Sequence, residues 1–416
     1  MKNFALADRT ESFDVDAVRR HFPVLARMVH GKPLAYLDNG ASAQRPNAVI
    51  DAVVDYERHH HANIHRGVHT LSQEATALYE SSRDRLVEFI GARSRHEVIF
   101  VRGTTEAINL VAQSYARPLL KPGDEILITH LEHHANIVPW QMVCEQTGAS
   151  LVVAPIDSRG EVHADAVLAL MTPRTRLFAC AHVSNSLGTV LPIRRLMTAA
   201  KARGIATLID GAQAVPHMHV DVQQLDCDFY AFSGHKMFGP TGVGVLYGRE
   251  QLLERMPPWQ GGGEMILAVT FAKTTYNGLP NKFEAGTPNI SGAIGLAAAV
   301  DYLLAMDRHA AQVHETALLE HATAALSKIP DVRIIGTAAD KASLVSFAVA
   351  GVHPHDLGTI LDEDGIAIRT GHHCAMPVME FFQLPATARA SFAFYNTFEE
   401  IDRLAAGVER ARKLFA

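Results

Sequence analysis

Cysteines are scarce in this chain and are not arranged in pairs. Its 416 residues contain four cysteines, Cys144, Cys180, Cys227 and Cys374, and no C-x-x-C motif. A chain of this length can bury a large core, so we do not expect a disulfide framework. Cys144, Cys180 and Cys227 lie in apolar patterns typical of small buried side chains. Cys374 lies outside any apolar run, in GHHCAMP (371–377).

Long apolar runs and an excess of positive charge are also absent. No run approaches the roughly 18 residues of a membrane-spanning helix. The net charge of -6 gives no electrostatic support for nucleic-acid binding. The first residues lack the apolar segment of a secretory signal and are too acidic for a transit peptide. We expect a short tail leading into a helix, in a cytoplasmic protein.

Short apolar runs alternate with helical patterns over about half of the chain. The expected strands are 97–101, 125–129, 150–156, 176–183, 206–210, 229–233 and 243–248. Expected helices lie between most of them, for example at 104–116. This alternation predicts an α/β fold with a mostly parallel sheet covered on both faces. Ligands bind such sheets at the carboxyl ends of the strands.

The remaining sequence predicts a second, smaller domain. Residues 266–292 carry Gly, Pro and Asn with weak periodicity, which favours loops. A strong helical pattern over 290–307 is expected to bridge two domains. Residues 308–416 mix helices with short strands at 344–350, 366–370 and 388–394, as in a small α+β domain. We therefore predict a large domain over 30–292 and a small domain formed by 1–29 and 293–416.

Three motifs supply groups that a single cofactor could bind. Lys236 lies between an apolar strand and a Gly-rich turn in SGHKMFGPTGVG, and Asp210 ends the strand before IDGAQAV. RGTTEAINLV (102–111) places Gly103 and two threonines at the start of a helix, whose N–H groups favour an anion. Pyridoxal phosphate needs an amine, a carboxylate for its pyridinium nitrogen and a phosphate cup. Singly, each motif also has a structural explanation; together they are much more specific.

A metal site is the alternative suggested by 23 histidines. Adjacent histidines, as at 59–61, 133–134 and 372–373, point to opposite faces of a strand and chelate poorly. The helical H-E-x-x-H pattern and the paired Cys/His spacings of structural zinc sites do not occur. We expect no metal.

The chain resembles the cysteine desulfurases of the SufS type, group II of the class V aminotransferase-like family. The resemblance spans nearly the whole chain and rests on ANIHRGVHTLS, RGTTEAINLVA, EHHANIVPW, HVSNSLGT, DGAQAV, DCDFYAFSGHKMFGPTGVG, FEAGTPN, RTGHHCAMP and ARASFAFYNT. One departure is Gly40 in DNGASAQRP, where the family usually has alanine. The resemblance implies fold type I of the pyridoxal-phosphate enzymes and a homodimer.

The resemblance also implies roles for individual residues. Lys236 matches the Schiff-base lysine, Asp210 the pyridinium partner and Gln213 the partner of the phenolic oxygen. His133 matches the imidazole that stacks on the cofactor ring and is a candidate for proton transfer. The matched phosphate contacts are Thr104, Thr105, Ser233 and His235, with Thr287 given by the neighbouring subunit. The matched substrate-site residues are Asn185 and Arg389, with Arg369 close by, and His65 and Arg66 reaching in from the other protomer. Taken singly, Asn185 also suits a turn, Arg389 a surface charge and Gln213 a helix cap.

Cys374 matches the nucleophile of the family. The implied reaction has L-cysteine displace Lys236, which then removes the Cα proton, after which the Cys374 thiolate attacks the substrate sulfur. Alanine leaves and Cys374 holds a persulfide destined for iron–sulfur cluster assembly. The short loop before Pro377 implies a SufE- or SufU-like sulfur acceptor and the Suf scaffold.

Rival functions remain open at this point. They are a selenocysteine lyase, a sulfinate desulfinase, an aminotransferase, a kynureninase-like hydrolase and, from another class, a non-enzymatic metal-binding or scaffold protein. The enzymes share the cofactor residues, and only desulfuration of cysteine requires the Cys374 thiol.

Overall fold

The computed structural model describes residues 13–415, so the expected N-terminal tail lies mostly outside the described residues. The expected helix after it is α1 (Val15–Arg19), which Asp14 caps. Its Arg19 pairs with Glu400 at 3.0 Å. The N-terminal segment is thereby tied to the last helix of the chain, α15 (Phe398–Leu414).

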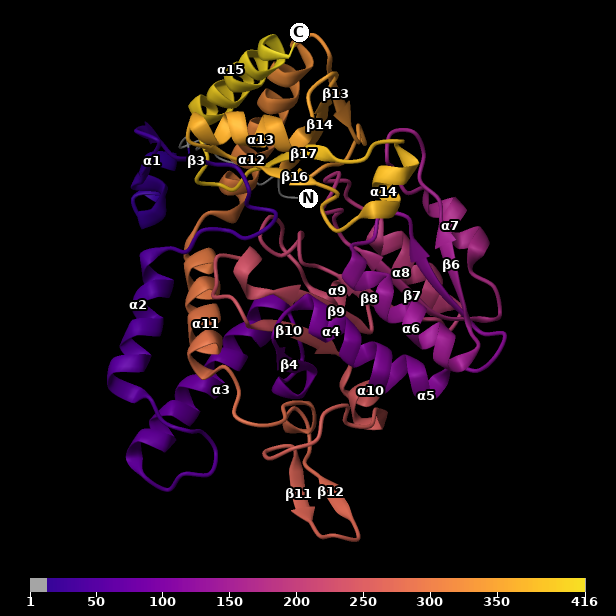
Figure 1. Ribbon diagram of the computed structural model, residues 1–416. Helices are drawn as coiled ribbons and strands as arrows, with labels where there is room; N and C mark the ends of the chain where they lie inside the picture. Colours follow the sequence, from indigo (N-terminus) through magenta and orange to yellow (C-terminus); the bar gives the residue numbers. More distant parts are fainter. Residues whose placement is uncertain (1–12, 416) are drawn as a thin grey trace, which may run out of the picture.

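A seven-stranded sheet forms the centre of the large layer, in the order β4-β10-β9-β8-β7-β5-β6 (Figure 1). The strands are β4 (Val98–Val101), β5 (Glu125–Thr129), β6 (Ser150–Ala154), β7 (Thr175–Ala181), β8 (Ala206–Asp210), β9 (Phe229–Ser233) and β10 (Gly244–Gly248). Only β10 pairs antiparallel with its neighbours. All seven strands lie where the sequence predicts them, and the mostly parallel sheet is confirmed.

Alternate residues of each strand pack into cores on the two faces of this sheet. Ile126, Leu208 and Leu246 belong to one core, whereas Leu127, Ile209 and Val245 belong to the other. The first core includes helices α4 (Thr104–Val111) and α6 (Val138–Thr147). The second includes α3 (Thr70–Ile90), α8 (Ile193–Ala202) and α11 (Ile290–Ala305). Because both faces are covered, the strands read as continuous apolar runs in the sequence.

The smaller layer is built on a four-stranded antiparallel sheet in the order β13-β14-β17-β16. Its strands are β13 (Val332–Ile335), β14 (Leu344–Val349), β16 (Arg369–Gly371) and β17 (Thr387–Ser391). Helices α12 (Arg308–Ser327), α13 (Pro354–Glu363) and α15 form a separate core with it (Figure 1). α14 (Met376–Phe381) follows β16. The expected α+β composition of this region is confirmed.

Two sequence expectations differ from the structure. The strand expected over 366–370 is two strands in different sheets, because β15 (Ile366–Ala367) pairs in parallel with β3 (Ala35–Tyr36) and β16 pairs with β17. The segment 266–292, expected to be loops, contains a hairpin of β11 (Ile266–Val269) and β12 (Thr274–Tyr276). The hairpin extends away from the rest of the chain (Figure 1). Its apolar side chains are exposed, Leu267 to 73% and Val269 to 61%, so no buried face produces an alternating pattern.

The helix expected at 290–307 is α11, which packs on α2 (Asn47–Asp55) and α3 of the large layer. The chain then turns by 88° into α12. The limits 30–292 and 293–416 remain a prediction of the domain division.

No single described helix is long and apolar enough to cross a membrane, and only α11 and α12 taken together reach that length and composition. The remaining elements are β1 (Met28–Val29), β2 (Lys32–Pro33), α5 (Arg117–Leu119), α7 (Ala164–Leu170), α9 (Val222–Leu225) and α10 (Glu250–Arg255).

Candidate active site

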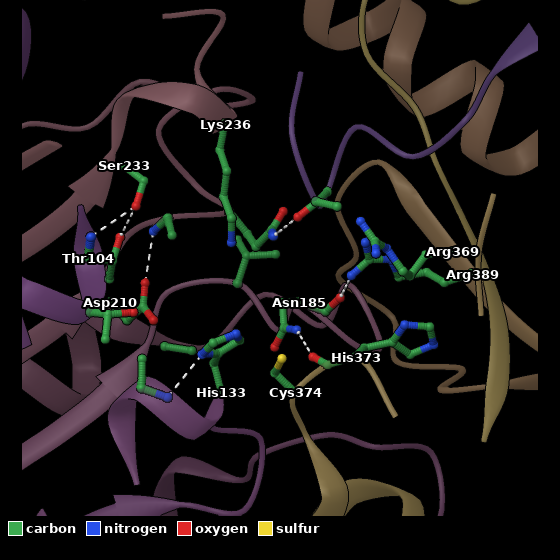
Figure 2. Close-up of a pocket in the computed structure, with 18 of the residues that line it drawn as sticks. Thr104, His133, Asn185, Asp210, Ser233, Lys236, Arg369, His373, Cys374 and Arg389 are labelled. Carbon is green, nitrogen blue, oxygen red and sulfur yellow. Dashed lines mark hydrogen bonds between the residues drawn. The ribbon is translucent and has the colours of Figure 1, made fainter. Parts of the chain in front are cut away.

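A cavity of about 450 Å³ lies at the carboxyl ends of the parallel strands and is closed by residues of the smaller layer (Figure 2). This volume is typical of small-molecule sites. Twelve of the residues singled out in the sequence line it: Thr104, Thr105, His133, Asn185, Asp210, Gln213, Ser233, His235, Lys236, Arg369, Cys374 and Arg389. The fold therefore brings together residues that are up to 285 positions apart, counting from Thr104 to Arg389 (389 − 104).

Lys236 and Asp210 enter the cavity from neighbouring strands. Lys236 ends the short turn Gly234–Lys236 after β9, and Asp210 is the last residue of β8. Burial lowers the pKa of Lys236, against the opposing charge of Asp210. Burial likewise raises the pKa of Asp210, against the charge of Lys236. A lowered pKa makes the amine easier to deprotonate, which a nucleophile or base requires.

These two groups fit pyridoxal phosphate. The Asp210 side chain accepts a hydrogen bond from the N–H of Ala212 at 2.9 Å, and its other oxygen has no partner among the residues described here. A carboxylate that is 8% exposed and half-satisfied needs a further donor, which a protonated ring nitrogen supplies. Lys236 supplies the amine for the cofactor's aldehyde. Gln213, which donates to the carbonyl of Gly40 at 2.7 Å, lines the same wall.

His133 lies on another wall as a neutral ring. Burial, followed by the charge of Lys236, lowers its pKa to about 3. One nitrogen, Nδ1, accepts the N–H of Ala135 at 3.0 Å. A neutral imidazole held in this way can stack on a flat ring and keep its second nitrogen for a proton, which agrees with the role implied by the resemblance.

The expected phosphate cup is built around the start of α4. Ser233 Oγ accepts the N–H of Thr104 at 2.9 Å and lies 2.8 Å from Thr104 Oγ1. Gly103 precedes the helix at φ +153°, and a Cβ there would lie 3.0 Å from Ser233 Oγ. Thr105 and His235 also line the cavity, and burial lowers the pKa of His235 to about 4. The helix N-terminus thus presents hydroxyls and N–H groups to an anion.

The expected substrate-carboxylate residues lie on the opposite side. Arg389 donates from Nη1 to the carbonyl of Asn185 at 2.7 Å, and Asn185 donates from Nδ2 to the carbonyl of His373 at 2.6 Å (Figure 2). Arg389 Nε and Asn185 Oδ1 are buried without a hydrogen-bond partner in the described part of the chain. Asp38, which the sequence did not single out, lies 3.0 Å from Arg369 and 3.4 Å from Arg389.

Cys374 lies at the mouth of the cavity in a constrained loop. It is exposed, whereas Cys144, Cys180 and Cys227 are buried, and burial raises the pKa of each buried thiol. His373 and Cys374 both have positive φ angles, 52° and 54°. The carbonyl of Cys374 accepts the N–H of His134 at 2.7 Å. The role of Cys374 as the nucleophile stays a prediction, and the sequence did not single out His134.

The two histidines before Cys374 point in different directions. The Nδ1 atom of His372 accepts the backbone N–H of Cys374 at 3.1 Å. The ring of His373 is buried and lies 2.8 Å from Thr387 Oγ1. Neither forms a hydrogen bond with the sulfur of Cys374. The His372 ring does contact His134, with ring centroids 5.6 Å apart.

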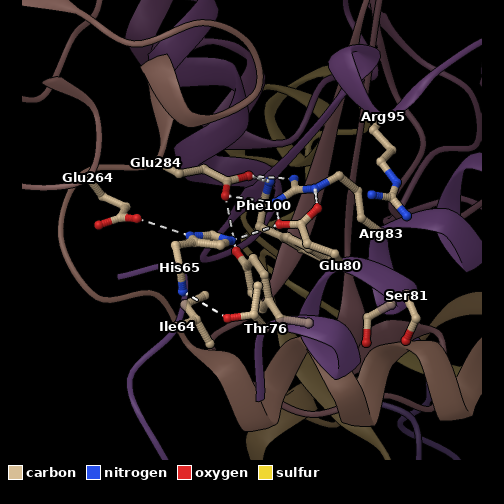
Figure 3. Close-up of polar contacts among 12 residues, drawn as sticks. Ile64, His65, Thr76, Glu80, Ser81, Arg83, Arg95, Phe100, Glu264 and Glu284 are labelled. Carbon is tan, nitrogen blue, oxygen red and sulfur yellow. Dashed lines mark hydrogen bonds and ion pairs between the residues drawn. The ribbon is translucent and has the colours of Figure 1, made fainter. Parts of the chain in front are cut away.

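Three residues expected to act across subunits lie outside this cavity. Thr287 lines a separate hollow with Arg102 and Trp259. His65 contacts Glu264 at 3.0 Å and Glu80 at 3.1 Å (Figure 3). Arg66 contacts Glu264 at 2.9 Å. The roles of Thr287, His65 and Arg66 in a partner subunit stay predictions.

Comparison with known proteins identifies the family. Residues 35–404 match the family described as aminotransferase class-V. The chain is 52% identical over 404 residues, 97% of its length and 99% of the relative's, to the cysteine desulfurase of Serratia proteamaculans. It is 50% identical over 398 residues, 96% of its length and 98% of the relative's, to the probable cysteine desulfurase of Vibrio cholerae.

Solved structures give the same result. The cysteine desulfurase CsdA of Escherichia coli superposes with a TM-score of 0.91 at 43% identity, over 98% of this chain and 100% of that one. The apo cysteine desulfurase of Thermococcus onnurineus also reaches a TM-score of 0.91, at 37% identity, over 99% of this chain and 100% of that one. With the cofactor fit described above, these matches place the chain in the aminotransferase class-V family, as a pyridoxal-phosphate-dependent enzyme of fold type I belonging to the cysteine desulfurases.

Proposed function

We propose that this enzyme converts L-cysteine to L-alanine and holds the released sulfur as a persulfide on Cys374. The observation that carries the proposal is the position of Cys374. It is the exposed cysteine of the four, and it lines the same cavity as Lys236 and Arg389. The relatives in Serratia and Escherichia carry the name cysteine desulfurase, which supports the same reaction.

The substrate is held by its carboxylate and activated at its Cα. The unpartnered Nε of Arg389 and the Asn185 side chain offer the carboxylate a charge-assisted anchor. Lys236, whose pKa is lowered by burial, takes the Cα proton. Pyridoxal phosphate, when bound, supplies an electron sink for the pair left at Cα, and the Asp210 carboxylate keeps its ring nitrogen protonated.

Sulfur transfer then balances without an external oxidant. The Cys374 thiolate forms a bond to the substrate sulfur as the substrate's Cβ–S bond breaks. The electron pair of that bond remains on Cβ, which takes up a proton and becomes the methyl group of alanine, and Lys236 returns a proton to Cα. The sulfur stays on Cys374 as a persulfide. His133, neutral because its pKa is about 3, can carry a proton between the substrate and the solvent side.

We assign the enzyme to the SufS type, with a dedicated protein acceptor. β16 ends at Gly371 and α14 begins at Met376, so Cys374 lies in a four-residue connection (376 − 371 − 1). The hydrogen bond from His134 restrains it further. A sulfur that cannot travel must be collected by a partner that brings its own thiol to the cavity mouth. A SufE- or SufU-like protein is the proposed acceptor, with the Suf scaffold and iron–sulfur cluster assembly downstream.

A homodimer completes this proposal. The cavity around Lys236 is not lined by Thr287, His65 or Arg66 of the same chain. This supports the implication that these residues contribute to the active site of a second copy of the chain. Light scattering of the holoenzyme should give the mass of a dimer. A stable and fully active monomer contradicts the contribution of these residues across subunits.

The reaction is tested by incubating purified holoenzyme with L-cysteine and measuring alanine and sulfide. Wild-type protein should give both in equal amounts with a reductant present, and a SufE- or SufU-like protein should raise the turnover severalfold. Cys374→Ala should keep the cofactor's absorbance and give no alanine. Cys144→Ala, which alters a buried thiol, is the matched control and should stay active. Trapping the persulfide on Cys144, Cys180 or Cys227 overturns the assignment.

A further inference from the structure

A second cavity, of about 440 Å³, lies on the other side of a strand end that walls the Lys236 cavity. His182, which follows β7, lines this second cavity. Ala181 and Val183, the residues on either side of it, line the Lys236 cavity. Successive residues of an extended segment point to opposite faces, so this segment separates the two cavities. The two cavities share no lining residue.

His182 offers the second cavity an N–H group. It is 8% exposed, and its Nδ1 atom lies 3.0 Å from the hydroxyl of Tyr230. Tyr230 is 0% exposed and its hydroxyl has no other partner among the described residues, so this hydroxyl donates to Nδ1. Burial lowers the pKa of His182 to about 4, so the ring is neutral and its single proton lies on Nε2. Nε2 has no hydrogen-bond partner in the described part of the chain and is not shut off from solvent, which reaches the ring through the cavity.

The N-terminus of α8 lies beside His182. The carbonyl of His182 accepts the N–H of Leu191 at 3.0 Å, two residues before the helix begins. The N-cap residue is Pro192, whose side chain forms no capping hydrogen bond. The backbone N–H groups of Arg194 and Arg195 have no partner among residues 13–415. Free N–H groups at the start of a ten-residue helix favour an anion.

One arginine of this cavity lacks a counter-charge. Arg195 pairs with Asp165. Asp221 caps α9, because its carboxylate accepts two N–H groups of that helix at 2.9 Å. Arg194 contacts the neutral amide of Gln224 at 3.3 Å and pairs with no carboxylate in the part of the chain that the structure describes. An anionic ligand would supply the missing counter-charge.

The cavity also has apolar walls, formed by Leu191, Ile193, Met218 and Leu225. We propose that this cavity binds a small organic oxyanion, a carboxylate or a phosphate ester. Its charged group is held by the Nε2–H of His182, the start of α8 and the Arg194 guanidinium, and its apolar part lies on the apolar walls. The inference goes beyond the proposed function, because this site is separate from the Lys236 cavity.

The binding of three probes to the holoenzyme, measured by calorimetric titration, tests the proposal. The probes are benzoate, phenyl phosphate and benzamide, which has the shape of benzoate without its charge. At least one of the two anions should bind, and benzamide should bind at least tenfold more weakly because it offers no charge to Arg194. The tighter anion shows whether the site takes a carboxylate or a phosphate ester. Binding of benzamide as tight as that of the anions, or binding of neither anion, overturns the proposal.

Two variants locate the bound anion. His182→Asn keeps an acceptor for the Tyr230 hydroxyl near the position of Nδ1 and removes the Nε2–H donor. Arg194→Gln removes the guanidinium charge. Each should weaken binding about tenfold, as expected for a hydrogen bond to a charged group. Arg203→Gln, which removes an exposed arginine at the other end of α8, is the matched control and should leave the affinity unchanged.

The Lys236 cavity is the alternative place for an anion, because Arg389 lines it. Arg389→Gln should leave the binding of the probe unchanged. Loss of binding in Arg389→Gln together with unchanged affinity in Arg194→Gln overturns the proposal. If His182→Asn cannot be purified with its cofactor, Arg194→Gln compared with Arg203→Gln decides alone, and equal affinities of these two variants overturn the proposal.

Discussion

The backbone N–H of His134 donates to the backbone carbonyl of Cys374 over 2.7 Å, and the ring of His134 accepts the N–H of Met376 at 3.1 Å. His134 thus holds the chain just after the Cys374 side chain, at the carbonyl of Cys374 and at the N–H of Met376. The first bond joins the large sheet's loops to the smaller layer. Cys374 is exposed yet fixed, which explains how a surface thiol can keep a constant position toward the cavity.

His134→Ala should loosen this segment without removing any group of the cavity wall. The backbone bond to Cys374 remains possible, and the bond to Met376 is lost. One such hydrogen bond contributes about 1 kcal/mol, which is about fivefold in the opening equilibrium of the loop. The alkylation rate of Cys374 by iodoacetamide, followed by peptide mass spectrometry, should rise accordingly. His163→Ala, on a distant exposed histidine, is the control. An unchanged alkylation rate in His134→Ala means that the ring does not restrain the loop.

Local patterns allowed the large sheet and half of the site to be predicted. Apart from the edge strand β6, the strands from β4 to β10 are almost wholly buried, so each gives a short apolar run ended by a turn residue. Lys236 and Asp210 sit directly at the ends of such strands, where α/β proteins bind ligands. Their chemistry could therefore be inferred from position and residue type.

Other features depend on contacts that no local pattern contains. Asp38 lies 351 positions before Arg389, and its contact with that arginine forms only when β3 pairs with β15 beside the substrate site. His134 stands in the sequence only as half of a histidine pair that chelates poorly, and its partner Met376 is 242 positions away, so no local pattern marks the contact. The β11–β12 hairpin was missed for a different reason. It packs on no core, so hydrophobic periodicity could not mark it.

Lys236 should carry the cofactor covalently. Reduction of the holoenzyme with borohydride, followed by peptide mass spectrometry, should place the pyridoxyl group on Lys236, and Lys236→Ala should lose the yellow colour. Lys341 is a demanding control, because burial lowers its pKa to about 8 and makes it a reactive amine as well. It donates to the carbonyl of Gly336 at 2.6 Å and does not line the cavity. An adduct on Lys341 instead would contradict the site as described.

Stability should fall on acidification because the buried ring of His373 stays neutral in the folded chain and takes up a proton when the chain unfolds. The pKa of His373 is about 3 in the folded chain, mainly because of burial, against an ordinary value near 6.5. Between these values the unfolded state binds the proton and the folded state does not, so stability falls as pH drops from about 6.5 toward 3. His373→Gln should reduce the loss of melting temperature between pH 7.5 and pH 5. His96→Gln, on the surface, should leave that difference unchanged.

Among the charged residues of the large layer, Arg83 should cost the most free energy of unfolding when it is removed. Its side chain is 0% exposed and donates to Glu284 at 2.7 and 2.9 Å and to the carbonyl of Val98 at 2.8 Å (Figure 3). Its guanidinium also lies 4.6 Å from the centre of the Phe100 ring. Breaking one partner of a buried pair leaves an uncompensated charge and typically costs 3–5 kcal/mol, so Arg83→Leu should lower the free energy of unfolding by about that amount.

Arg85, on the same helix as Arg83, is the control for this last prediction. Arg85 is 50% exposed and pairs with Glu88 and Asp301 on the surface, so Arg85→Leu should cost less than about 1 kcal/mol. The double variant Arg83→Leu/Glu284→Gln removes both charges and should be less destabilised than the sum of the single variants, because no lone carboxylate remains buried. Denaturant titration of the wild type, Arg83→Leu, Glu284→Gln, the double variant and Arg85→Leu gives these differences. Equal costs for Arg83→Leu and Arg85→Leu would mean that the buried pair contributes no more than a surface one.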